Sequence, residues 1–143
     1  MSLSMHKKRE QVFKLLFRRE FHKDAAMEEQ ERLFFEARPE GEPELSEKDS
    51  EYISGKYHRV AEKIPEIDAM VSERTSGWDI SRIGRVELTI LRLAIYEMLY
   101  DEAVPEGVAI NEAVELSKEF GQDNSSSFVN GVLALFAEKK ENG

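Results

Sequence analysis

Three apolar segments with helical spacing follow one another in the second half of the chain, and they constrain the fold most. They cover residues 85–100, 108–116 and 128–133. Apolar residues surround most of the circumference of the first segment, so we expect it at the centre of the fold. The other two segments each carry one Asn, Asn111 and Asn130, among aliphatic residues. Because Asn is a poor helix former and an unpaired buried amide costs about 1–3 kcal/mol, we expect both to make buried hydrogen bonds between two helices.

The rest of the chain has helical spacing as well, and no run alternates apolar and polar residues over the length of a strand. Two prolines and a glycine in residues 38–43 predict a loop, Pro65 suits the first turn of a helix, and Gly121 suits a helix end. Ser46 with Asp49 resembles a capping box that opens a helix. Trp78, the only tryptophan, is expected to wedge between helices. The expected helices span about residues 5–22, 26–37, 46–63, 65–77, 85–100, 108–120 and 125–139. The sequence therefore predicts one all-α domain of about seven helices over residues 1–143.

Several classes of function are disfavoured by what the chain lacks. It has no cysteine, which excludes disulfides and thiolate metal sites and fits a reducing cytoplasm. No apolar run approaches the ~20 residues that span a bilayer. There is no glycine-rich phosphate loop, no His-Glu-x-x-His and no Gly-x-Ser-x-Gly, and the three histidines are expected on solvated helix surfaces. We therefore expect no catalytic residue, no metal site and no enzyme.

The charge distribution is uneven along the chain. The net charge is −9, which by itself argues against a nucleic-acid-binding protein. Residues 1–20, however, hold six Lys and Arg against two Glu, so the remainder carries −13. Such an asymmetry suggests a basic binding site on an acidic body.

The basic residues of the first helix share one face. At 100° per residue, Lys7, Gln11, Lys14 and Arg18 form a polar stripe, with Phe17 and Phe21 along its border. A cationic stripe edged by aromatic rings suits single-stranded RNA, because cations contact phosphates and rings stack on unpaired bases. The pattern also suits an ordinary solvated face of an amphipathic helix with Phe17 and Phe21 in the core, and spacing alone favours that second interpretation.

Motifs along nearly the whole chain carry a family resemblance. They are Arg9-Glu10 followed by Leu15-Leu16-Phe17, the segment 91–97 (Leu-Arg-Leu-Ala-Ile-Tyr-Glu), the segment 110–116 (Ile-Asn-Glu-Ala-Val-Glu-Leu), Phe120-Gly121, and the segment 128–133 (Phe-Val-Asn-Gly-Val-Leu). In this order and spacing the chain resembles the NusB family of bacterial transcription antitermination factors.

The resemblance implies a fold, partners and a cellular compartment. The fold would be two packed three-helix subdomains. The partners would be NusE, a small-subunit ribosomal protein, and the single-stranded boxA element of nascent ribosomal RNA leaders rather than DNA or a membrane. Bound to boxA, the pair would help build the RNA polymerase antitermination complex in the cytoplasm. No small-molecule cofactor comes with the family.

The resemblance also implies which residues contact RNA. The basic arm at Lys7, Lys8 and Arg9 matches the family's arginine-rich start, although its two lysines lack the bidentate guanidinium fork. A second RNA-facing region lies around the turn before the last helix, where Asn124 stands in place of a frequent acidic residue. With two cations from the stripe, the expected RNA-binding residues are Lys7, Lys8, Arg9, Lys14, Arg18, Lys118, Phe120, Asn124, Ser125 and Phe128. For Phe128, core packing is an equal alternative.

We hypothesise that the first helix and the 118–128 region form one RNA surface, and that the basic ribosomal protein docks on the acidic body. The candidate partner face holds Glu66, Asp68, Glu73, Asp79 and Glu87. Two other functions stay open. The chain could be the RNA-binding module of a ribosomal RNA methyltransferase, although no methyl-donor-binding domain follows, or it could be a helical adaptor that binds only protein.

Overall fold

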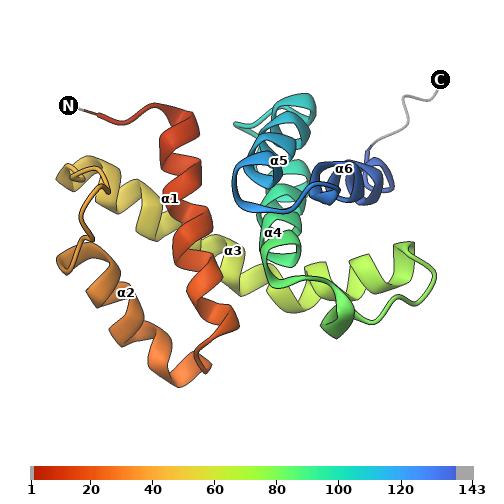
Figure 1. Cartoon of the computed structure of the whole chain (residues 1–143), viewed down its shortest axis with the longest axis horizontal. Coiled ribbons are helices and arrows are strands. Elements are labelled where there is room, and N and C mark those ends of the chain that lie inside the picture. The colour runs from red at the N-terminus through yellow and green to blue at the C-terminus, as the bar shows by residue number, and fades with distance from the viewer. Residues whose placement is uncertain (1, 138–143) are drawn as a thin grey trace. The chain divides into compact units, whose positions relative to one another are not determined.

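Helices dominate the computed structural model, which describes residues 2–137 (Figure 1). Over that range there are six α-helices and no strand. The helices are α1 (Met5–Phe17), α2 (Met27–Glu36), α3 (Glu47–Arg74), α4 (Arg85–Tyr100), α5 (Glu106–Phe120) and α6 (Ser125–Ala134). Short 3-10 turns cover Arg18–Glu20, Asp24–Ala26 and Ile80–Arg82. The predicted all-α class is confirmed. None of these helices is long and apolar enough to cross a lipid bilayer.

The chain forms two compact units, one up to Glu62 and one from Lys63 onward. The first holds α1, α2 and the first part of α3, and among its buried side chains are Phe13, Leu16, Phe34 and Ile53. Ser46 precedes α3, and its hydroxyl accepts a hydrogen bond from the Asp49 backbone N–H at 3.0 Å. The predicted cap of this helix is therefore confirmed.

The second unit is built around α4. This helix packs against both α5 and α6, which also pack against each other. Every residue from Leu88 to Glu97 except Arg92 is buried, as the all-round apolar pattern predicts. Gly121 ends α5 as expected.

One continuous helix, α3, replaces the two helices expected over 46–63 and 65–77. Pro65 lies inside it instead of opening a new helix. An interior proline removes one backbone hydrogen bond and crowds the preceding turn. The helix continues because its apolar stripe continues, with Ile53, Val60, Ile67 and Val71 all buried on either side of the proline. Six helices rather than seven result.

The first and last helices are shorter than expected. Regular α1 ends at Phe17 and gives way to the 3-10 turn, where the expected helix ran to residue 22. Helix α6 ends at Ala134, and the part of its expected range beyond residue 137 lies outside the described residues.

A Schellman motif ends α3 and positions Trp78. The backbone N–H of Gly77 donates to the Ser72 carbonyl at 2.7 Å, and that of Ser76 donates to Glu73 at 3.3 Å. Ser76 and Gly77 both adopt left-handed backbone conformations, with φ of 63° and 89°. The next residue, Trp78, is 47% exposed, so its predicted wedging between helices is wrong.

The two helical asparagines are exposed, and the prediction that they make buried hydrogen bonds is wrong. Asn111 on α5 and Asn130 on α6 line a shallow pocket with Ile110, Ser126 and Ser127. Both residues are exposed, so no neighbouring helix buries their amides. Helical spacing places a residue on a face, but it does not say whether a neighbouring helix covers that face.

Candidate nucleic-acid interface

Lys7 is the most exposed cation of the basic arm. Its side chain is 55% exposed, and its Nζ lies 3.5 Å from Glu10 Oε1. Lys8 is more enclosed, with Nζ 3.6 Å from Asp49 and 5.1 Å from the centre of the Tyr52 ring. Arg9 is buried at 6% exposure. The predicted arm therefore offers one readily accessible cation, and its other two are held by the fold.

The polar stripe of α1 faces other parts of the first unit. Lys14 Nζ lies 2.8 Å from Glu42, while the side chain of Gln11 is fully buried and donates to the same carboxylate at 3.1 Å. Arg18 donates to the Gln30 backbone carbonyl at 3.1 Å and lies over the Phe34 ring. The stripe exists as predicted, but α2 and the 38–43 loop occupy it.

Glu42 is the electrostatic centre of that contact. The hydrogen bond from Lys14, together with Gln11 and the charge of Arg38, holds the pKa of Glu42 below its ordinary value. Arg38 also donates to Gln11 Oε1 at 2.8 Å. Any RNA contact by Lys14 has to compete with this network.

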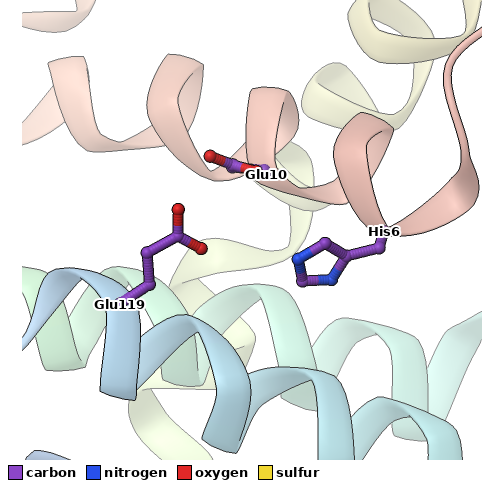
Figure 2. Close-up of side chains that lie close together, drawn as sticks. All are labelled: His6, Glu10 and Glu119. Carbon is purple, nitrogen blue, oxygen red and sulfur yellow. The ribbon is translucent and has the colours of Figure 1, made fainter.

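Figure 2 shows two further polar residues of α1, one helical turn apart. His6 is half-buried and Glu10 is buried at 6% exposure, so the expectation of a fully solvated His6 is wrong. Lys14 Nζ approaches Glu10 Oε2 at 3.8 Å, and Lys7 approaches the other oxygen. Two lysines therefore flank this buried carboxylate. The third labelled side chain, Glu119, belongs to α5 in the second unit.

The second predicted region lies at the turn between α5 and α6. Lys118 is 62% exposed, with Nζ 3.6 Å from Glu115, and Phe120 is half-buried. Ser125 is buried, accepts a hydrogen bond from the Gln122 backbone N–H at 2.8 Å and donates to Glu87 on α4. Asn124 is exposed at the N-cap position of α6, where its side chain makes no capping hydrogen bond.

Asn124, Ser125 and Phe128 line one pocket of about 710 Å³ in the second unit. Its other lining residues are Trp78, Asp79, Arg82, Ile83, Gly84 and Glu87. Lys118 and Phe120 do not line it. Three of the expected RNA-binding residues are thus brought together, in a pocket that combines an aromatic pair with charged side chains.

Two residues of this pocket were missed by sequence reasoning. Trp78 stacks on Phe128, with ring centres 5.7 Å apart and an angle of 10° between the ring planes. Arg82 follows on the 3-10 turn and is exposed. Sequence spacing carries no signal for the pairing of Trp78 with Phe128, because these two residues are fifty residues apart in the chain.

The candidate partner face is partly neutralised within the second unit. Asp68 accepts two hydrogen bonds from Arg92, at 2.9 and 2.7 Å. Glu66 lies 3.6 Å from Lys63, and Asp79 accepts from the backbone and hydroxyl of Ser81. The unit is nevertheless acidic, since residues 63–143 hold eight Lys and Arg against fifteen Asp and Glu.

Comparison with known proteins decides the family. The model of the NusB family matches residues 6–138. The chain belongs to the NusB family. A NusB transcription antitermination protein from Lachnoclostridium phytofermentans is 44% identical over 126 residues, which cover 88% of this chain and 92% of the relative.

Solved structures agree with the NusB assignment. Thermotoga maritima NusB superimposes with a TM-score of 0.81 at 33% identity, covering 99% of this chain and 94% of that one. A second structure contains antitermination factors NusB and NusE in complex with double-stranded RNA. It matches with a TM-score of 0.74 at 24% identity, covering 92% of this chain and 94% of that chain, and therefore shows the shared fold.

NusB membership confirms the predicted function class, a transcription antitermination factor that is not an enzyme. It favours this class over the methyltransferase module, because the curated relative is an antitermination protein matched over nearly its whole length. The individual RNA-binding residues stay predictions.

Proposed function

We propose that this NusB-family protein acts with the ribosomal protein NusE to bind single-stranded boxA RNA of ribosomal leader transcripts. The pair would join the RNA polymerase antitermination complex in the cytoplasm, where nascent transcripts are made. The family match over residues 6–138 carries the proposal. The solved complex of NusB and NusE with double-stranded RNA, whose NusB has the same fold, supports it because it contains a NusE protein and an RNA.

The charge distribution supports RNA binding by cations of both this chain and NusE. Among the predicted RNA-binding cations of the first unit, Lys14 and Arg18 have partners within that unit and Arg9 is buried. RNA affinity of this chain alone should therefore be modest, with a salt dependence in proportion to the few phosphates that it contacts. A basic ribosomal protein docked on the acidic second unit would supply further cations, and charge complementarity would steer its docking.

The test is a titration of labelled boxA RNA with the full chain, with and without NusE, using a scrambled boxA as control. We expect tighter binding of boxA than of the scrambled RNA, and a further gain when NusE is present. Equal affinities with and without NusE would refute the cooperation between the two proteins. Absence of binding in both cases would refute RNA recognition.

Charge-reversal variants then test the two predicted regions. Lys7→Glu and Lys118→Glu alter exposed cations in separate units, so both proteins should fold normally. Lys48→Glu, at another exposed lysine, is the matched control. We expect weaker boxA binding and a smaller salt dependence for the first two, and no change for the control. A protein-binding adaptor would show no RNA binding before or after any of these changes.

A further inference from the structure

The Trp78 indole ring is a large aromatic surface that the fold leaves uncovered. Phe128 lies parallel to one face of the ring, and 47% of the residue is still exposed. The Schellman turn at Ser76 and Gly77 fixes the backbone immediately before it. Trp78 and Phe128 together form a partly exposed aromatic patch beside a pocket, a feature that marks binding sites.

Two pockets adjoin this aromatic pair. The pocket of about 710 Å³ holds Arg82, and a second pocket of about 440 Å³ holds Arg74, while Trp78 and Phe128 line both. Arg74 is exposed and donates to the Leu135 carbonyl at 3.1 Å. The aromatic pair is therefore a platform with an arginine in each adjoining pocket.

The carboxylates of the larger pocket are already hydrogen-bonded. Asp79 accepts two hydrogen bonds from Ser81, which hold its pKa below its ordinary value. Glu87 accepts from the buried Ser125 hydroxyl. With Arg82 and Arg74 counted, the charges lining the two pockets balance, although the second unit as a whole is strongly acidic. Because these charges cancel, the electrostatic repulsion of an RNA phosphate should be small at the platform.

We propose that an unpaired RNA base stacks on the Trp78 ring, with Arg82 contacting a neighbouring phosphate. The inference rests on the proposed RNA-binding function and adds a stacking residue to it. A flat ring stacked on a second ring, with cations beside it, is the arrangement by which proteins hold single-stranded RNA. The expected RNA-binding residues Asn124, Ser125 and Phe128 line the same pocket, which favours RNA over a protein side chain as the occupant.

Trp78 is the only tryptophan of the chain, so its fluorescence reports on this site alone. Single-stranded boxA RNA is added to the full-length protein, before and after addition of a tryptophan-free NusE. Binding is followed separately by fluorescence anisotropy of end-labelled RNA. We expect Trp78 emission to be quenched in proportion to the RNA bound.

Variants separate stacking from a structural role. Trp78→Ala should weaken RNA binding at least about five-fold, and Trp78→Phe should retain part of the affinity because it keeps an aromatic face. Arg82→Gln should reduce the salt dependence of binding, whereas Arg59→Gln, at an exposed arginine of the first unit, should not. Unchanged helical circular dichroism shows that each variant is folded.

The outcomes distinguish this inference from the proposed function. RNA binding by anisotropy with unchanged Trp78 emission and full affinity of Trp78→Ala would overturn the stacking site and leave the function intact. Quenching by NusE alone, with no further change on adding RNA, would likewise overturn it by making the platform a protein-docking site. Absence of RNA binding altogether would overturn the proposed function as well.

Discussion

Gly121, at the turn between α5 and α6, should not tolerate a methyl group. A Cβ at this position would lie 2.6 Å from the side chain of Ser125 and 2.7 Å from the Ser117 carbonyl oxygen. These distances are well inside van der Waals contact, and one of the crowded atoms is backbone. Gly131 on α6 is the matched control, because a Cβ there meets nothing within 4 Å.

The two alanine substitutions should change stability in opposite directions. For Gly121→Ala, displacing the turn should cost about 1–3 kcal/mol of unfolding free energy, as overpacking does elsewhere. The displaced Ser125 would also weaken its hydrogen bonds to Gln122 and Glu87. For Gly131→Ala, relief of the glycine penalty inside a helix should stabilise by about 0.5–1 kcal/mol.

Thermal and urea unfolding followed by circular dichroism measure both effects. With about 3–4 °C of Tm per kcal/mol for a chain of this size, Gly121→Ala should lower Tm by roughly 3–12 °C. Gly131→Ala should raise it by about 2–4 °C. A Tm for Gly121→Ala at or above that of the wild type would refute the close approach of Ser117 and Ser125 to this glycine.

Three further predictions concern single residues. Glu42→Gln should flatten the loss of stability below about pH 5. The pKa of Glu42 is lower in the folded than in the unfolded protein, so its carboxylate stabilises the fold above the unfolded pKa, and this contribution is lost as the pH falls and the carboxylate is protonated. Urea midpoints measured from pH 3 to 7 test this, and an unchanged slope of stability against pH would contradict it. Asp68→Asn should cost about 1–3 kcal/mol in urea unfolding, since it removes the negative charge and one of the two oxygens that accept hydrogen bonds from Arg92; an effect as small as that of removing the exposed Glu115 carboxylate would speak against it. Pro65→Ala should stabilise by about 1–2 kcal/mol because it restores a backbone donor inside α3, and a lower urea midpoint would show that the proline is not strained there.

Sequence periodicity predicted the helices well where an apolar face is continuous. The central position of α4, the end of α5 at Gly121 and the cap at Ser46 all follow from local patterns, because these patterns depend on neighbours in sequence. Pro65 shows the limit of such reasoning. Its local preference for a helix start was outweighed by burial of apolar residues on either side of it.

The candidate site depended more on tertiary structure. The sequence grouped Lys7, Gln11, Lys14 and Arg18 on one helix face, and in the structure Gln11 and Lys14 both contact Glu42. It could not show that Glu42, Gln30 and Phe34 cover the face, because these residues come from other segments.

By itself the sequence determined the helical class, the family and which residues share a helix face. Only the tertiary structure decided that Asn111 and Asn130 are exposed and that Trp78 stands beside Phe128 at the rim of a pocket. The physical reason is that a helix's own geometry fixes the direction of each side chain, whereas burial depends on which distant segment packs against it.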